Sequence, residues 1–379
     1  MIIGINALYL LPGKVGGSET YLRNLIKGLA AIDRENEYVI FINRETQDKI
    51  DAPAPSFCTV VCPFRASNRP LRILWEQCVL PWYVKRHKID ILLSAGMTAP
   101  ILCPAVSVLM LFDLQHINQP GNFSWFYLPF LRSIIYASAR SADGVLTISR
   151  QVKNDIIRSY HLPLEHIEVT HLAVDHSAFT LHGPPDTVTV KARYGLPDRF
   201  ILYAASSLPH KNHERLFQAF RRVREQVPEI QLVLIGARDK GEDALIRMIK
   251  EQGLEQTIIL LGWIPFEDVP SIYRASEVFV FPTLHEGFGL PIIEAMSCGV
   301  PVVCSRIEPL LEVAGDAVLF VDPLSPDEIA AAVIKVVTDL PERERLISKG
   351  LVRSSEFTWE TTAKRTLAFL TTITTAKKG

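Results

Sequence analysis

Short runs of apolar, often β-branched residues alternate along the chain with longer segments in which apolar residues recur every three or four positions. Runs that are apolar at nearly every position are typical of parallel strands buried on both faces of a sheet. Segments with the helical period predict amphipathic helices that cover those faces. The alternation therefore predicts an α/β protein built from doubly wound parallel sheets.

The predicted elements fall into two similar halves. In the first half the strands are MIIGIN (1–6), YVIFIN (38–43), TVVCPF (59–64), IDILLS (89–94), AVSVLMLFD (105–113) and GVLTIS (144–149), and the clearest helices are 19–32 and 71–85. In the second half the strands are RFILYAAS (199–206), IQLVLIG (230–236), TIILLGWI (257–264), EVFVFPT (277–283), PVVCS (301–305) and AVLFVDP (317–323). Helices are predicted there at 212–226, 243–252, 265–274, 291–298, 307–314 and 326–340.

The boundary between the halves is predicted in FTLHGPPDTVTVKARYG (179–195), where apolar residues become sparse and Gly183-Pro184-Pro185 interrupts the pattern. We assign residues 1–180 and 187–359 to two Rossmann-like domains. A last helix within 360–379 has no strand of its own to follow. A length of 379 residues also favours two domains over one.

Composition narrows the class of protein. The formal net charge is −1, which gives no indication of nucleic-acid binding. No apolar run approaches the roughly 20 residues that span a bilayer, and the first residues lack the basic region of a secretory signal. The six cysteines show no C-x-x-C spacing, so reduced thiols in a cytoplasmic protein are expected.

The segment 282–303 combines chemistry that is uncommon in a simple turn. A strand ends, Gly287 and Gly289 follow, and Pro291 suits the first turn of a helix, with Glu286 and Glu294 on either side. Amides at the start of a helix attract anions, and carboxylates accept hydrogen bonds from hydroxyls. A nucleotide-sugar offers both groups. The alternative is a pair of solvated glutamates beside turn glycines, and the order of strand, turn and helix favours the ligand site.

HEGFGLPIIEAMSCGVPVV (285–303) resembles the EX7E signature of the retaining glycosyltransferases of family 4, which have the GT-B fold. Further segments resemble that family in the expected order along nearly the whole chain. They are GGSETYLRNLIKGLA (16–30), SADGVLTISRQVKNDI (141–156), IEVTHLAVD (167–175), LPHKNHERLFQAF (208–220), LLGWIPFEDVPSIYRASEVFVFPT (260–283) and FTWETTAKRTLAFL (357–370). The resemblance implies two Rossmann-like domains that face a cleft, with the C-terminal helix crossing back to the first domain.

The resemblance also implies an activity. A hexosyl group, mannose or glucose, would pass with retained configuration from a UDP- or GDP-sugar to a glycan or lipid-linked acceptor in the synthesis of a surface polysaccharide or glycolipid. No cofactor other than this substrate is implied. A nicotinamide-dependent dehydrogenase is the rival with similar domains, but the first strand is not followed by G-x-G-x-x-G.

Residue roles follow from the same resemblance. Lys211 would neutralise the donor diphosphate, Glu294 would bind the ribose hydroxyls, and Glu286 would contact the transferred sugar. The remaining expected donor contacts are Gly16, Gly17, His210, Trp263, Ile264, Gly287, Phe288, Gly289 and Leu290.

Two positions depart from the family pattern. Ser206 and Ser207 stand where an arginine often precedes the lysine, so His210 or a residue of the first domain would supply the second positive contact. Phe112 stands where many members have a histidine, so Asp113 or His116 would take a polar role near the reacting centre, or the acceptor would be held differently. These departures motivate the non-enzyme alternative, a noncatalytic nucleotide-sugar-binding partner of another glycosyltransferase.

Catalysis is expected to be independent of metal. No two aspartates are separated by one residue, so the D-x-D pattern of metal-dependent glycosyltransferases is missing from the sequence. Lys211 and the helix N-terminus would stabilise the leaving diphosphate instead. Glu286 is expected to bind hydroxyls, with front-face attack, rather than to act as a covalent nucleophile.

The acceptor side of the protein is less defined by its residues. A basic, tryptophan-containing stretch at 65–88 predicts contact with the anionic inner face of a membrane, although an ordinary Rossmann helix with solvated flanks fits equally well. The aromatic stretch GNFSWFYLPFLRSIIY (121–136) fits either an acceptor channel or core packing. We expect a cytoplasmic protein that works at the inner face of a membrane.

Overall fold

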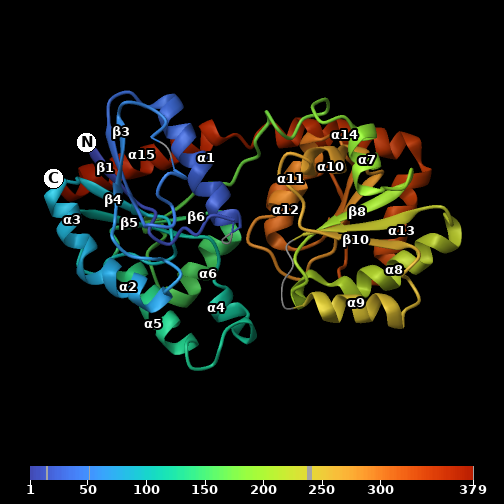
Figure 1. Cartoon of the computed structure of the whole chain (residues 1–379), viewed down its shortest axis with the longest axis horizontal. Helices are drawn as coiled ribbons and strands as arrows, with labels where there is room; N and C mark the ends of the chain where they lie inside the picture. Colours follow the sequence, from blue (N-terminus) through green and yellow to red (C-terminus); the bar gives the residue numbers. More distant parts are fainter. Residues whose placement is uncertain (14–15, 51, 237–240, 379) are drawn as a thin grey trace. The chain divides into compact units, whose positions relative to one another are not determined.

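The computed structural model describes residues 1–13, 16–50, 52–236 and 241–378. It divides into two compact units, one formed by Met1–Leu172 with Trp359–Gly379 and the other by Ala173–Thr358. Each unit contains a parallel sheet covered by helices, as the sequence predicts (Figure 1). Residues 173–186, which the sequence interpretation placed in the first domain and the linker, belong to the second unit.

In the described part of the first unit, the sheet has the strand order β3-β2-β1-β4-β5-β6-β7. Its strands are β1 (Ile2–Asn6), β2 (Glu37–Ile42), β3 (Phe57–Val61), β4 (Ile91–Ser94), β5 (Val106–Leu111), β6 (Gly144–Thr147) and β7 (Ile167–Val169). Its helices are α1 (Gly17–Ile32), α2 (Arg69–Cys78), α3 (Leu80–Arg86), α4 (Gln115–Asn118), η1 (Pro120–Asn122), α5 (Leu128–Ser141), α6 (Arg150–Tyr160), η2 (Leu164–His166) and α15 (Trp359–Lys378).

In the described part of the second unit, the strand order is β10-β9-β8-β11-β12-β13. Its strands are β8 (Phe200–Ala204), β9 (Gln231–Ile235), β10 (Ile258–Gly262), β11 (Val278–Phe281), β12 (Val302–Ser305) and β13 (Leu319–Val321). Its helices are α7 (Thr187–Tyr194), η3 (Pro209–Lys211), α8 (His213–Gln226), α9 (Glu242–Glu251), α10 (Val269–Ala275), α11 (Leu290–Ser297), α12 (Glu308–Ala314), α13 (Pro326–Thr338) and α14 (Leu340–Ser354).

The order of the strands positions the sites. In the second unit the chain runs outward from β8 through β9 to β10, and then returns to β11 on the other side of β8. Ligands of such sheets bind where the strand order reverses, outside the carboxyl ends of the strands. The loops after β8 and β11 meet at that edge, and they carry Lys211 and Glu286. The equivalent reversal in the first unit lies between β1 and β4.

The C-terminal helix α15 packs against α1, which confirms that the end of the chain returns to the first unit (Figure 1). The two helices approach closely at Gly28, where a Cβ atom would lie 2.8 Å from the carbonyl oxygen of Trp359 and 3.0 Å from the Cβ of Ala363. The end of α15 is tied down by an ion pair between Lys377 and Asp143, with 2.7 Å between Nζ and Oδ2. None of the helices in the described part of the chain is long and apolar enough to cross a bilayer.

Prolines account for two differences from the predicted helices. The helix expected at 71–85 is interrupted at Val79, because Pro81 has no N–H to continue the hydrogen-bond series and instead opens α3. The helix expected at 265–274 begins only at Val269, with Pro270 in its first turn. The helix α14 was not predicted, although Asp339 caps it by accepting a hydrogen bond from the Glu342 amide at 3.1 Å.

Candidate active site

The turn between β11 and α11 has the form that the glycines and proline predict. Gly289 precedes the first residue of α11 with φ of 103°, in the region that L-residues rarely adopt. A Cβ atom at this position would lie only 2.5 Å from Cδ2 of Leu310. Pro291 occupies the first turn of the helix, where its missing N–H costs no hydrogen bond. The amides at this end of α11 therefore face the loop that contains Glu286.

Gly289→Ala is expected to destabilise the protein by about 2–4 kcal/mol, from backbone strain and the clash with Leu310 together. Thermal unfolding should report this as a lowered midpoint. Gly253→Ala is the matched control, because Gly253 also has positive φ, at 66°, but nothing lies within 4 Å of its added Cβ. Equal losses of stability in the two variants would show that the contact with Leu310 does not define this turn.

The loop after β8 is held against the end of β11. Asn212 adopts the left-handed conformation, with φ of 63°, and its side-chain amide donates to the carbonyl oxygens of Pro282 at 2.8 Å and Pro323 at 2.7 Å. The backbone amide of Leu284 donates to the carbonyl of His210 at 2.8 Å. These bonds fix the position of Lys211, the residue between His210 and Asn212.

Lys211 and Glu286 form an ion pair, with 2.5 Å between Nζ and Oε1. Their side chains are only 14% and 18% exposed, so water screens the pair weakly. The Nζ atom also lies 5.6 Å from the centre of the Phe281 ring, on the last residue of β11. Burial and the Lys211 charge lower the pKa of the neighbouring His210 to about 4, so this imidazole is neutral at pH 7. The site thus holds one ammonium group beside one carboxylate.

Glu294 lies on α11 and is partly accessible. The buried hydroxyl of Tyr273 donates to its Oε2 at 3.1 Å. Burial raises the pKa of the Glu294 carboxyl to about 7. Among the described residues no hydrogen-bond donor contacts Oε1, so this atom can accept from a ligand hydroxyl. The carboxylate form is the better acceptor, and the hydroxyls of a bound ligand would stabilise it.

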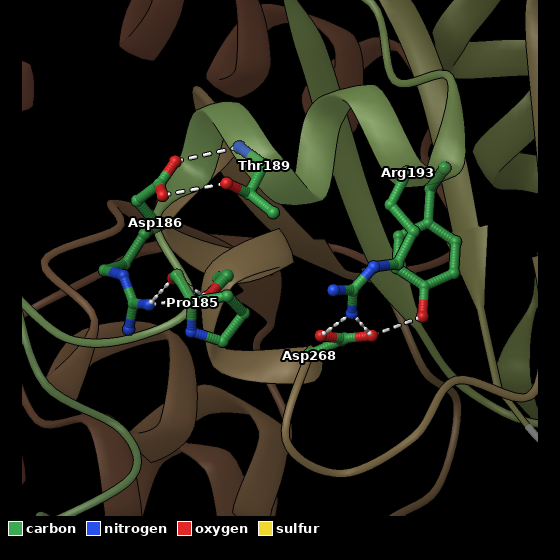
Figure 2. Close-up of polar contacts among 8 residues, drawn as sticks. Pro185, Asp186, Thr189, Arg193 and Asp268 are labelled. Carbon is green, nitrogen blue, oxygen red and sulfur yellow. Dashed lines mark hydrogen bonds and ion pairs between the residues drawn. The ribbon is translucent and has the colours of Figure 1, made fainter.

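Tyr273 is held in place by the attachment of α10 to α7. Asp268, just before α10, accepts from the guanidinium of Arg193 at 2.6 and 2.7 Å and from the hydroxyl of Tyr194 at 2.6 Å (Figure 2). Asp186 caps α7 by accepting from the amide and hydroxyl of Thr189, both at 2.8 Å (Figure 2). These contacts fix the helix that carries the hydrogen-bond donor to Glu294.

Three residues of this site were not found from the sequence: Tyr203, Asn212 and Tyr273. The hydroxyl of Tyr203 donates to the carbonyl of Lys211 at 2.5 Å. Both tyrosines occupy apolar positions of their elements and are fully buried, so the pattern indicates only core packing for them. Asn212 did carry a signal, because asparagine adopts the left-handed conformation more readily than most residues.

The other predicted donor contacts take no part in this ion pair. Trp263 and Ile264 follow β10, which β9 and β8 separate from β11, with Trp263 67% exposed and Ile264 buried. Phe288 is buried and packs edge-on against Phe357, so only its backbone could serve a ligand. Gly16 and Gly17, at the start of α1, belong to the first unit. The roles of these residues stay predictions.

In the first unit, His116 does not present a free imidazole. It is buried on α4, and its Nε2 atom lies 2.7 Å from the hydroxyl of Tyr160. Burial lowers the pKa of His116 to about 4, which keeps the ring neutral. Asp113 accepts from the amide of Gln115 at 3.1 Å, and Phe112 packs edge-on against Tyr21 at 5.2 Å. Catalytic roles for Asp113 and His116 stay predictions.

Within the described ranges, no three His, Cys, Asp or Glu side chains form a group that could hold a metal ion. Whether catalysis is independent of metal is tested by turnover in excess EDTA.

Comparison with known proteins identifies the family. Residues 15–178 match the family described as "Glycosyltransferase Family 4", and residues 190–352 match "Glycosyl transferases group 1". Together the two matches support a family 4-type GT-B glycosyltransferase. The two matches correspond to the two units, and the second contains Lys211, Glu286 and Glu294.

Named relatives of this glycosyltransferase include mannosyltransferases. The "O-antigen chain mannosyltransferase B" of Escherichia coli is 36% identical over 240 residues, which are 63% of each chain. The "MMP alpha-(1->4)-mannosyltransferase" of Mycolicibacterium hassiacum is 30% identical over 236 residues, 61% of this chain and 54% of the relative. The matched segments thus cover less than two thirds of either relative.

Solved structures show the same GT-B fold over nearly the whole chain. A sucrose-phosphate synthase from Thermosynechococcus elongatus aligns with a TM-score of 0.77 at 19% identity, covering 99% of this chain and all of that one. Anabaena Alr3699/HepE in complex with UDP-glucose aligns with a TM-score of 0.75 at 20% identity, covering 98% and 100%. At these identities the likeness concerns the fold alone.

Proposed function

We propose that this chain is a retaining mannosyltransferase that uses a nucleotide-diphosphate sugar and extends a glycan or lipid-linked acceptor of a cell-surface polysaccharide, on the cytoplasmic side of the membrane and without a metal ion. The observation that carries the proposal is the ion pair of Lys211 and Glu286 beside the amide-bearing start of α11. It provides a cation and helix amides for a diphosphate, and a carboxylate for sugar hydroxyls.

Mannose is preferred over glucose because of the relatives. The names of the E. coli and Mycolicibacterium proteins specify mannosyl transfer, and the first names O-antigen, a surface polysaccharide. The HepE structure contains UDP-glucose, but its identity of 20% supports no substrate assignment for this chain. None of the described site residues distinguishes guanine from uracil, so GDP-mannose and UDP-glucose are the two donors to compare.

The proposed reaction assigns each group a role. The bond between the sugar C1 and the diphosphate oxygen breaks, and Lys211 with the amides of α11 stabilises the negative charge that develops on the leaving diphosphate. The acceptor hydroxyl attacks C1 from the same face, which retains the configuration, and its proton passes to the departing phosphate oxygen. Glu286 accepts hydrogen bonds from the sugar hydroxyls, and Glu294 accepts them from the ribose.

A donor panel tests the proposal. The protein is incubated with GDP-mannose, UDP-glucose and ADP-glucose, with mannosyl oligosaccharides as acceptors, and the release of nucleoside diphosphate and elongated glycan is measured. Turnover is expected with GDP-mannose and should persist in excess EDTA. Loss of turnover in EDTA with recovery in Mn²⁺ would refute metal-independence. Tight nucleotide binding without turnover of any donor would favour a noncatalytic binding partner.

A further inference from the structure

Helices α2 and α3 present an apolar strip to the outside of the first unit. Leu71, Leu74, Cys78 and Trp82 recur at intervals of three and four residues, which places them on one side of the nearly continuous helix pair. Leu71, Leu74 and Trp82 are 45%, 59% and 53% exposed. The opposite side of the pair is buried in the core of the unit. A strip of this kind on an otherwise amphipathic element indicates an interaction surface.

Cations flank the strip, and the acids near it are buried or hydrogen-bonded to backbone amides. Glu45, which lies near Arg65, accepts from the amides of Ala66 and Ser67. The exposed cations are Arg65, Arg69, Lys85, Arg86 and Lys88. Glu76, the acid within this basic stretch, is only 1% exposed because it lies on the buried side of α2, and burial raises its pKa. Asp90 accepts from the amide of Ile2 at 2.8 Å, at the edge of the sheet. We call the strip and these five cations the α2–α3 face.

Further exposed apolar groups adjoin the α2–α3 face at the start of α2 and near its end. At the start of α2, Asn68, Arg69 and Pro70 share a hollow of about 620 Å³ with Phe126 and Tyr127, and Phe126 is 71% exposed. Near the end of α2, the side chain of Gln77 bonds to the backbone of Ala99 and Ile101, which holds the 83%-exposed Leu102 beside the helix. The apolar surface is therefore broader than one helix.

We propose that the α2–α3 face docks on the surface of an anionic lipid bilayer. The helix pair would lie in the plane of the interface, with Leu71, Leu74 and Trp82 in the boundary between headgroups and acyl chains and the flanking lysines and arginines at the lipid phosphates. A second copy of the chain fits this surface poorly, because pairing two identical faces would bring five cations against five. An anionic bilayer matches both the charge and the apolar strip.

Vesicle co-sedimentation tests the proposal independently of any enzymatic activity. The full chain is mixed with vesicles of phosphatidylethanolamine and phosphatidylglycerol, and separately with phosphatidylcholine vesicles. Binding is expected to the anionic vesicles and should weaken steeply with salt. Arg69→Gln/Lys85→Gln should reduce this binding at least about tenfold, since each cation at such a surface strengthens binding about fivefold. Leu74→Ser/Trp82→Ser should reduce it at least about tenfold as well, because it removes apolar side chains from the interface.

The matched control is Leu340→Ser/Val352→Ser, which removes two equally exposed apolar side chains from the second unit. This control should bind anionic vesicles as strongly as the unchanged protein does. All variants should have the same midpoint of thermal unfolding as the unchanged protein. Equal binding by the α2–α3 variants and the control, or no binding to anionic vesicles at all, would overturn the proposal. A monomer–dimer equilibrium abolished by Leu74→Ser/Trp82→Ser, without lipid binding, would assign the face to a second copy and overturn it as well.

Discussion

Lys211→Ala is expected to lower kcat for glycosyl transfer by about 10²–10³-fold, with a much smaller effect on the donor KM. The ammonium group is one of the few charges placed to stabilise the leaving diphosphate, whose charge grows most in the transition state. The variant also leaves Glu286, which is only 18% exposed, without its ion-pair partner and next to the donor phosphates. Steady-state kinetics across donor concentrations separates the two parameters.

Two companion variants distinguish catalysis from structure. Lys349→Ala removes another ion pair of the same unit, that of Lys349 with Asp316, and should leave kcat unchanged because the pair is exposed. Lys211→Ala/Glu286→Gln removes both charges of the buried pair, so it should recover thermal stability lost in the single variant but not the activity. Recovery of kcat in the double variant would show that Lys211 serves only to neutralise Glu286.

Glu294→Gln is expected to weaken donor binding about 10–100-fold, because a charged acceptor of ribose hydroxyl bonds is replaced by a neutral one. The wild-type affinity should itself depend on pH. With a pKa raised to about 7 by burial, Glu294 is mostly protonated at pH 6, so donor binding should be about tenfold weaker there than at pH 8. The diphosphate diester of the donor does not titrate in this range. Calorimetric titration at several pH values measures both effects.

Glu294 should also make the folding stability of the donor-free protein depend on pH. Its pKa is higher in the folded than in the unfolded protein, so the folded state binds the proton more tightly. The stabilisation from Glu294 is complete below about pH 4.5 and is lost as pH rises to about 7, with a span of about 2–3 kcal/mol. Glu294→Gln should remove this dependence, whereas Glu308→Gln, at an exposed glutamate of α12, should keep it. Parallel pH profiles in all three proteins would contradict the assigned role of Glu294.

Much of the fold could be predicted because burial on both faces leaves a direct mark on the sequence. All six residues of β5 are buried, and the corresponding run is apolar except for Ser107. β7 was not predicted, because it contains Glu168 and is flanked by His166 and Thr170, so no apolar run is visible there. The division between the units was also displaced, since residues 173–186 contain few apolar positions yet belong to the second unit.

The sequence indicated Lys211, Glu286 and Glu294 as candidate site residues, but it did not indicate their contacts. Lys211 and Glu286 stand in recognisable segments, but they are 75 positions apart, and only the adjacency of β8 and β11 brings them together. Tyr273 had no signal of its own, because a buried tyrosine that donates to a carboxylate has the same periodicity as one that only packs. Glu76 is the opposite case, because a glutamate in a basic stretch is expected at the surface, yet its side chain is buried. The contacts of these residues depend on elements that are far apart in the sequence, so the local pattern does not show them.

A crystal structure of the protein with a nucleoside diphosphate, GDP or UDP, tests the central claim most directly. The measurement is the distance from the β-phosphate oxygens to Nζ of Lys211 and to the amides at the start of α11. Distances of about 2.7–3.2 Å to Lys211 and to at least one of those amides are expected. A nucleotide bound elsewhere, with Lys211 still paired to Glu286 and no phosphate at α11, would contradict the account.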